Sequence, residues 1–308
     1  MKTIRSVIKP ETGRILSLIL CVLCLTGCFS VVSFADTGPK PSVIVTFKNL
    51  EDTKCFGTLL SENASTGPFS AWDGTGEGRF GTVDPAVWQA FVDYEDTDGY
   101  FYLQNSFNVG EEKAISWTYY PPERFKILLY FPEYNSYAVS GVLNKYAFDS
   151  YFTVDMKGVD VSASYTGAGS AARISAVKKS YPWTKELLSL LARIVITIAI
   201  EIGVALLFRL KEKPVLKFIV IANLITQVIL NVSLNIINYR EGAFMLIIAY
   251  FLLELFVFVI EAALYAARLN RYSAKHHSPW FCIAYAFAAN LASFFAGLAL
   301  AIIVPFIF

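Results

Sequence analysis

Charged residues, histidines and cysteines are scarce in this chain of 308 residues. Only 17% of the residues are charged, 55% are hydrophobic, and the formal net charge is +1. No patch of lysine and arginine interleaved with aromatic residues is present, which argues against nucleic acid as a partner. So apolar a composition is typical of a chain with a membrane-embedded part, and we expect the lipid bilayer as a partner.

The residues that usually carry catalysis are missing as well. The two histidines are the neighbours His276 and His277, and no Gly-x-Ser-x-Gly or His-Glu-x-x-His motif occurs. An intramembrane or envelope enzyme is therefore the least favoured function class, and we predict no catalytic residue, metal or cofactor. Among the five cysteines, Cys55 alone falls in the region expected to be exported. We expect it to be a buried thiol, with a bridge to another chain as the alternative.

The N-terminus has the pattern of a secretory signal peptide over residues 1–35. Basic residues up to Arg14 precede an apolar stretch over 15–25. Three fates remain open: cleavage after Ala35, lipidation of Cys28 in a Leu-Thr-Gly-Cys lipobox, or an uncleaved anchor. Each of them exports the region that follows.

Residues 36–165 predict an extracytoplasmic all-β domain. Short segments rich in β-branched and aromatic residues alternate apolar and polar positions between turn signals such as Asp98-Gly99. The predicted strands are 42–47, 55–60, 100–103, 114–120, 124–131, 136–142, 146–156 and 159–165, with a helical turn near 85–91. This spacing favours an antiparallel sandwich, of which an Ig-like fold is one form. Residues 166–186 predict a juxtamembrane linker.

Four apolar stretches over residues 187–308 predict an all-α four-helix transmembrane bundle. The spans are 187–210, 215–239, 243–267 and 280–308, each long enough to cross about 30 Å of hydrocarbon. The loops before 215 and before 280 are basic, so the positive-inside rule places them in the cytoplasm. We therefore expect a multi-pass cell-membrane protein with its N-terminal domain and C-terminus outside the cytoplasm.

Polar residues inside these spans are the main candidate site. They are Arg193, Glu201, Asn223, Gln227, Asn231, Asn235, Glu254, Glu261 and Asn290. Counting about 1.5 Å per residue from the helix ends places Glu201, Asn223, Glu261 and Asn290 in one layer. An ionisable group at membrane depth needs a partner, a proton or a water path. Interhelical hydrogen bonds that hold the helices together and a site for a proton, cation or polar headgroup both remain open.

The exported domain offers weaker candidates. A glycine-rich loop within 61–90 carries Phe69, Trp72, Asp73 and Phe80, which suits ligand binding or an ordinary connection. The acidic segment 93–99 superficially resembles a calcium loop, but Asn105 stands where the twelfth-position glutamate belongs. A hairpin turn at Asp98-Gly99 explains that segment without a metal.

The signal peptide, the segment DTGPKPSV at 36–43, the run from Asn223 to Asn231 and the Glu254/Glu261 pair together resemble a known group. These are uncharacterised membrane proteins of Gram-positive, clostridia-type bacteria, with an exported β domain and four C-terminal transmembrane helices. The resemblance implies the architecture and the compartment, and it implies no activity.

Two functions of different kinds follow from these patterns. The first is a cell-surface sensor, receptor or assembly component, whose exported domain binds an envelope protein, peptide or glycan. The alternative is a proton- or cation-coupled transporter or channel subunit that uses the intramembrane glutamates.

Overall fold

The computed structural model of the protein describes residues 39–50, 53–76, 78–79 and 83–303. The predicted signal peptide, with Cys28 and Ala35, lies outside the described residues. So does Phe80 of the predicted binding loop.

Two β-sheets make up most of the region before residue 180. The first has the strand order β12-β10-β1-β6, and the second has the order β11-β8-β7-β2-β5, with β9 beside β7 and a separate pair β3-β4. The strands are β1 Ser42–Lys48, β2 Phe56–Ser61, β3 Ser65–Thr66, β4 Phe69–Ser70, β5 Phe101–Tyr102, β6 Ala114–Trp117, β7 Arg124–Phe131, β8 Ser136–Ser140, β9 Leu143–Asn144, β10 Asp149–Asp155, β11 Ala172–Ile174 and β12 Val177–Lys179. A short helix, α3 (Val109–Glu112), precedes β6.

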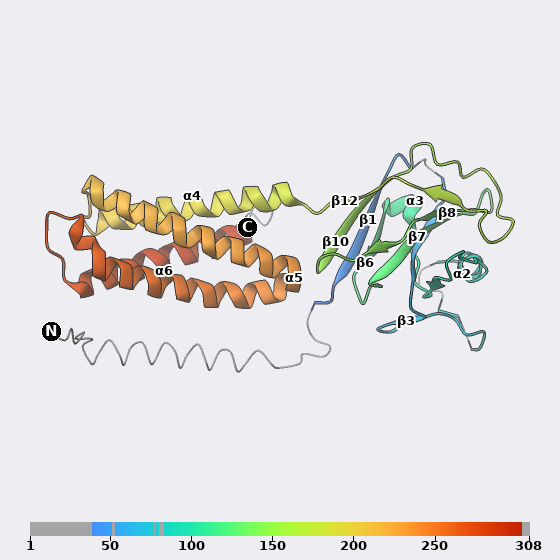
Figure 1. The fold of residues 1–308 in the computed structure, drawn as a ribbon, viewed down its shortest axis with the longest axis horizontal. Coiled ribbons are helices and arrows are strands. Elements are labelled where there is room, and N and C mark those ends of the chain that lie inside the picture. The colour runs from blue at the N-terminus through green and yellow to red at the C-terminus, as the bar shows by residue number, and fades with distance from the viewer. Residues whose placement is uncertain (1–38, 51–52, 77, 80–82, 304–308) are drawn as a thin grey trace, which may run out of the picture. The chain divides into compact units, whose positions relative to one another are not determined.

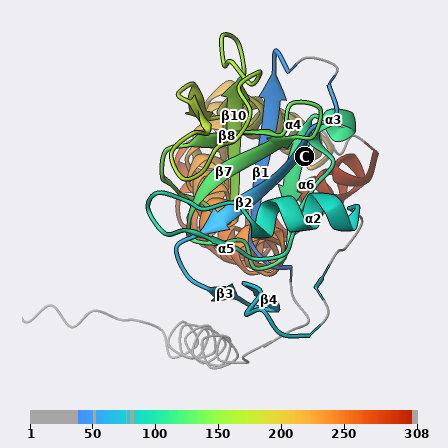
Figure 2. The ribbon, with the colours of Figure 1, turned by 90° about the vertical axis from the view of Figure 1, so that its right-hand side faces the viewer.

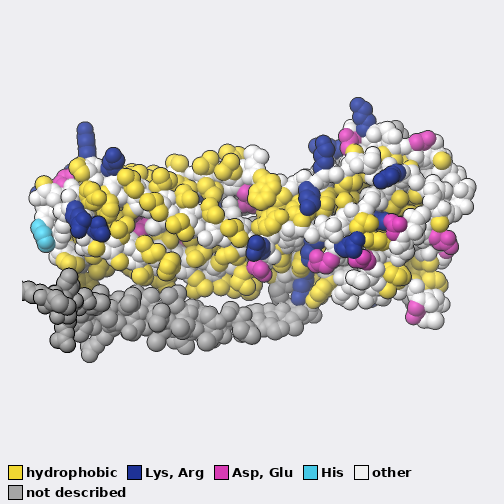
Figure 3. All heavy atoms as spheres, in the orientation of Figure 1, with side chains coloured by type: hydrophobic (Ala, Val, Ile, Leu, Met, Phe, Trp, Pro, Cys, Tyr) yellow, Lys and Arg dark blue, Asp and Glu magenta, His cyan; other side chains and the backbone are white. Residues whose placement is uncertain are grey.

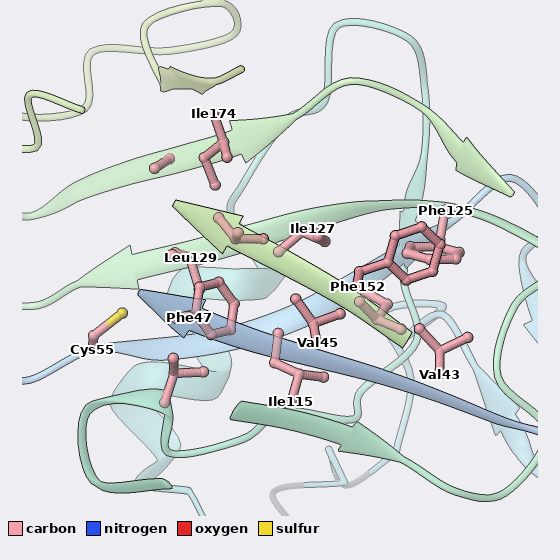
Figure 4. Packing of buried hydrophobic residues seen from close by; sticks show 14 of the residues in the cluster. Val43, Val45, Phe47, Cys55, Ile115, Phe125, Ile127, Leu129, Phe152 and Ile174 are labelled. Carbon is pink, nitrogen blue, oxygen red and sulfur yellow. The ribbon is translucent and has the colours of Figure 1, made fainter. Parts of the chain in front are cut away.

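The two main sheets share one hydrophobic core. Val43, Val45 and Phe47 alternate along β1 toward this core, and Ile127 and Leu129 of β7 meet them from the other sheet (Figure 4). Burying one such side chain fully contributes about 1.5–3 kcal/mol, so the alternation along β1 specifies which face of the strand points inward. The sheets therefore form a sandwich, as the sequence predicts. Cys55 is a free buried thiol in this core, and burial raises its pKa to about 12.

Helix α2 (Pro85–Val92) covers the outer face of the second sheet, over β2 and β7 (Figure 2). Asp84 caps its first turn by accepting a hydrogen bond from Ala86 N, and Pro85 fits the first helical position. Its buried residues Val87, Trp88 and Phe91 pack on the sheet. The prediction of helix here is confirmed, and β7 is buried on both faces as a result.

The strand pairing differs from the antiparallel sandwich predicted. β1 pairs with β10 in parallel, and β11 pairs with β8 in parallel. The predicted strand over 159–165 is absent, and β5 pairs with β2 rather than forming a hairpin around Asp98-Gly99. The predicted linker 166–186 instead holds β11, β12 and the start of a helix. Short edge strands such as β11 and β12 are stabilised by the strands that they pair with, and local composition does not reveal that pairing. The Ig-like form stays a prediction.

Three helices follow: α4 (Trp183–Leu207), α5 (Lys213–Arg268) and α6 (Pro279–Ile303), with a 3₁₀ turn, η2 (Leu269–Arg271), after α5. They run alongside one another (Figure 1). All three are long and apolar enough to cross a membrane, whereas the sequence predicts four spans. The difference arises because the predicted spans 215–239 and 243–267 both fall within α5.

Gly242 divides α5 into two helical segments. Its φ of 80° and ψ of −178° are not helical, and an added Cβ would lie 2.4 Å from the Phe148 ring. Glycine is therefore required at this bend by both backbone and space. The segments 213–241 and 243–268 lie antiparallel, because Asn223 bonds to Tyr265 and Thr226 bonds to Glu261.

The outer surface of the helices is mostly apolar, while charged side chains gather at the end with the two basic loops (Figure 3). Those loops are neighbours, since Ala274 N donates to Glu212 Oε2 at 2.7 Å and the Phe218 and Tyr272 rings stack at 4.6 Å. Exposed apolar helix surface with charged ends is the pattern of a membrane-embedded bundle.

Candidate functional site

Glu261 occupies the centre of the helical bundle. It is fully buried, and each carboxyl oxygen accepts one hydrogen bond from another helical segment. Thr226 Oγ1 donates to Oε1 at 2.6 Å, and Asn290 Nδ2 donates to Oε2 at 2.8 Å. This carboxyl therefore joins both segments of α5 to α6.

Glu201 on α4 is equally buried, but its carboxyl group differs from that of Glu261 in its hydrogen bonding. Neither of its carboxyl oxygens has a hydrogen-bond partner among the described residues. The Asn223 carboxamide lies near this carboxyl without meeting hydrogen-bond geometry, and the Glu261 and Glu254 carboxyls lie close enough to add their like charge. A buried polar group left without a partner costs about 1–3 kcal/mol, and more if it is charged.

The neighbouring carboxamides direct their N–H groups to acceptors other than Glu201. Asn223 Nδ2 donates to Ile219 O at 3.1 Å and to Tyr265 Oη at 3.0 Å. Asn290 Nδ2 donates to Ala286 O as well as to Glu261. Their Oδ1 atoms are buried and lack partners within the described part of the chain.

We call Glu201, Asn223, Thr226, Glu261 and Asn290 the acceptor layer. Within residues 183–303 it contains four buried oxygens that accept no hydrogen bond: both of Glu201 and one each of Asn223 and Asn290. A carboxylic O–H can donate to an acceptor, and a cation can bind several acceptors together. The arrangement is therefore suited to a proton or a small cation. In the described residues, no cluster of three or more His, Cys, Asp or Glu could hold a metal ion.

A cavity of about 210 Å³ adjoins the acceptor layer, and we call it the bundle cavity. Its polar lining comes from Arg193, Thr197, Gln227, Asn231, Tyr250, Glu254 and Ser293. The rest of its wall is aliphatic and aromatic. The Glu254 carboxyl interacts with the Tyr250 hydroxyl one turn earlier in the helix.

The structure thus divides the predicted intramembrane residues into two groups. Glu201, Asn223, Glu261 and Asn290 come together, as their depths predict. Four others line the bundle cavity: Arg193, Gln227, Asn231 and Glu254. Asn235 is half-buried and belongs to neither group.

Hydroxyl groups complete both groups, and the sequence reasoning missed them. Thr226 bonds to Glu261, Tyr265 accepts from Asn223, and Ser293 donates to Asn290 O. The spacing of Thr226, thirty-five residues before Glu261, contains no signal of this bond. Threonine, tyrosine and serine are common in apolar helices, so only the packing of the helices identifies these partners.

The predicted loop site in the sandwich does not form an open aromatic surface. Phe69 packs edge-on against Trp117 with ring centroids 5.1 Å apart, and Trp72 packs likewise against Trp88 at 5.3 Å. Asp73 is exposed and closes a turn by accepting from Thr75 N and Oγ1. These two hydrogen bonds lower the pKa of Asp73. Phe69 and Trp72 are therefore packing residues.

The acidic segment 93–99 forms an ion pair rather than a calcium loop. Lys126 Nζ lies 2.7 Å from Asp96 Oδ2 and 2.7 Å from Asp98 Oδ2, and the Lys126 and Asp96 side chains are buried. Asp96 also accepts from the backbone N–H groups of Asp98 and Tyr100. Burial would lower the pKa of Lys126, but the bonds to Asp96 and Asp98 outweigh it and raise that pKa. Protein donors therefore bond to both oxygens of the Asp96 carboxylate.

One further hollow lies on the sandwich, and we call it the sandwich cleft. Its volume is about 640 Å³, and residues 156–162, Asn49, Phe131 and Tyr134 contribute to its wall. Asp160 in this wall is exposed and has a lowered pKa, because the side chain and backbone N–H of Ser162 donate to it.

Protein-family models, curated protein sequences and solved structures were each compared with the chain, and none matches. The features of the molecule that bear on its function are the acceptor layer, the two hollows and the helices that carry them.

Proposed function

We propose that this protein is a multi-pass membrane protein whose helical bundle binds a proton or monovalent cation, as a transporter or channel subunit. The observation that carries the proposal is Glu201, which is fully buried and has no hydrogen-bond donor for either carboxyl oxygen among the described residues. The three apolar helices of membrane-spanning length support placing this residue inside a membrane-embedded bundle.

The distribution of donors separates a binding site from structural glue. If the polar residues only held the helices together, their donors would be shared among all the buried acceptors. Instead Thr226 and Asn290 both donate to Glu261. Glu201 and two amide oxygens accept no hydrogen bond from the helices that the structure describes, and a bound proton or cation would satisfy them.

The proposal includes four membrane crossings, with α5 contributing two. Each α5 segment exceeds the about 20 residues that span a bilayer, and Gly242 lies at the bend between them. Both basic loops lie at the other end of the bundle, which supports placing that end in the cytoplasm. The sandwich would then face the outside, as the sequence of the signal region predicts. Export in a Gram-positive envelope remains part of this proposal.

A sensor or receptor is the second candidate, and one contact favours it. Phe148 N, just before β10, donates to Tyr239 O at 2.9 Å, and its ring packs on Gly242. Tyr239 also stacks on Trp183 at the start of α4, with centroids 5.6 Å apart. Phe148 precedes β10 and the cleft residues 156–162 follow it, so in a receptor β10 would connect a protein, peptide or glycan bound in the sandwich cleft with the bend in α5.

The test compares wild type with Glu201→Gln in purified full-length protein. We expect the thermal midpoint of the wild type to change with Na⁺ concentration or with pH, and Glu201→Gln to lose most of that dependence. In proteoliposomes, the variant should lose proton or cation flux under an imposed gradient. Glu241→Gln, an exposed glutamate beside the bend, is the matched control and should behave as wild type.

The proposal fails if the wild type responds to neither Na⁺ nor pH more than Glu201→Gln does. A folded wild type without flux, combined with specific capture of an envelope ligand by the sandwich, would favour the receptor. Flux that is unchanged in Glu201→Gln would remove this residue from the pathway.

A further inference from the structure

The bundle cavity has the size and the chemistry of a small-molecule site. The cavity has a volume of about 210 Å³ and lies among α4, both segments of α5 and α6, beside the acceptor layer. One water needs roughly 10–15 Å³ of such volume, so the cavity accommodates a molecule of about a dozen non-hydrogen atoms. Ligand sites of this kind are mostly apolar with a few placed polar groups.

Opposite charges line the same apolar cavity. Arg193 from α4 contributes a guanidinium, and Glu254 from the second segment of α5 contributes a carboxyl. A guanidinium has five N–H donors, so Arg193 can bind a ligand carboxylate in addition to the interaction that it already makes. Glu254 retains lone pairs beyond its contact with Tyr250.

The carboxamides extend this complementarity. Gln227 and Asn231 are one turn apart on the first segment of α5, and Asn231 Nδ2 donates to Gln227 O at 2.9 Å. Gln227 and Asn231 are 3% and 2% exposed, so both side chains lie inside the protein. They can orient a polar headgroup between the two charges, while Leu230 and Phe251 contact an apolar group.

We propose that the bundle cavity binds a zwitterion with an apolar side group, its anionic end toward Arg193 and its cationic end toward Glu254. The inference rests on the proposed function, because this molecule would be the substrate coupled to the ion in the acceptor layer. A ligand with only an anionic group would make no contact with the Glu254 carboxyl, and one with only a cationic group would make none with the Arg193 guanidinium. A bare acyl chain would use neither charged group of the lining.

Free α-amino acids with apolar side chains and zwitterionic phospholipids share this chemistry. The probes are L-leucine and L-phenylalanine for the first source and dihexanoylphosphatidylcholine for the second. Binding to the purified full-length protein is measured by calorimetry. Two truncated probes, L-leucinamide without the carboxylate and 4-methylpentanoate without the ammonium, should bind at least about tenfold more weakly than L-leucine.

Variants test the two charges separately. Arg193→Gln should weaken L-leucine binding at least about tenfold and abolish the preference for L-leucine over L-leucinamide. Glu254→Gln should abolish the preference over 4-methylpentanoate. Arg240→Gln and Glu241→Gln, adjacent exposed residues outside the cavity, are the matched controls. If the Arg193 or Glu254 variants do not fold, the wild-type probe series decides alone.

The outcomes separate this inference from the proposed function. L-Leucine binding that persists in Glu201→Gln while Na⁺ or pH dependence is lost supports both. If only the phospholipid binds, the zwitterion is a lipid headgroup. The inference is overturned if neither zwitterion binds, or if the truncated probes bind as tightly as L-leucine.

Discussion

Lys126 in the sandwich and Glu201 in the bundle are both buried, ionisable side chains, yet their surroundings differ. Lys126 is 3% exposed and has two carboxylates within 2.7 Å. Glu201 is 0% exposed and has no hydrogen-bond partner in the described part of the chain. In the bundle the available donors go to Glu261 instead.

The difference distinguishes a group that holds the fold from one kept for a ligand. A buried pair such as Lys126 and Asp96 is strongly destabilising to break, although it adds little net stability compared with apolar packing. A buried carboxyl without a donor destabilises the protein until something neutralises it. Such local conflicts are expected at functional sites, where a ligand supplies the missing group.

The largest expected effect is in the sandwich. Lys126→Met should lower the free energy of unfolding by about 3–5 kcal/mol, because it leaves Asp96 buried and uncompensated. Denaturant titration of the full-length protein, followed by tryptophan fluorescence, measures the change.

Arg124, two residues earlier on β7, gives the matched control. Its pair with Glu62 is exposed, with side chains 51% and 43% accessible, so Arg124→Met should cost about 0–1 kcal/mol. If Lys126→Met lost no more stability than Arg124→Met, the buried pair would have no structural role.

The next effect compares the two glutamates of the acceptor layer. Glu261→Ala should destabilise the protein by about 1–3 kcal/mol, because Thr226 and Asn290 would lose their shared acceptor. Glu201→Gln should leave stability equal to or above that of the wild type without Na⁺, since its new N–H₂ can donate to the Asn223 Oδ1. Thermal unfolding in detergent ranks the two variants. A Glu201→Gln variant as unstable as Glu261→Ala would make Glu201 a structural residue.

The sequence predicts the sandwich core better than its pairing. Val43, Val45 and Phe47 alternate with Ile44, Thr46 and Lys48, and the polar Thr46 and Lys48 indicate which face of β1 is buried. The parallel partner of β1 is β10, in which Asp149 pairs with Ser42 from 107 residues further along the chain. No local sequence pattern encodes a pairing over that separation. The local sequence leaves the role of Phe69 and Trp72 open, because a loop aromatic can pack on a core, as both do here, as readily as bind a ligand.

The sequence predicts the level at which the residues of the acceptor layer lie along the helices, but not the hydrogen bonds among them. Helical rise alone places Glu201, Asn223, Glu261 and Asn290 at one level. Which of them obtains a donor depends on how the helices are rotated about their axes, and that depends on side-chain packing along their whole length. The unpaired state of Glu201 could therefore be found only in three dimensions.

An effect of similar size is expected at the bend between the two segments of α5. Gly242→Ala should destabilise the protein by about 1–3 kcal/mol, because its φ is positive and the Phe148 ring occupies the position of the new Cβ. Gly203→Ala in α4 is the control, since nothing lies within 4 Å of that Cβ, and it should be neutral or stabilising. Thermal unfolding compares them. Equal stability of the two variants would show that Gly242 does not fix the bend, and partial rescue by Phe148→Ala would identify the clash.

The smallest effect is the pH dependence of stability that Asp155 in the sandwich contributes, which must be known before any pH dependence is assigned to the bundle. The side chain of Asn49 and the backbone N–H of Lys157 donate to Asp155 and lower its pKa in the folded state. Its carboxylate therefore stabilises the fold above the unfolded pKa of about 3.9, and this contribution is lost as pH falls through the folded pKa. Asp155→Asn should be slightly less stable than wild type at neutral pH, with the gap closing below about pH 4. Glu133→Gln is an exposed control. A gap that instead appears only near neutral pH would assign that pH dependence to another group, and Glu201→Gln would show whether it belongs to the acceptor layer.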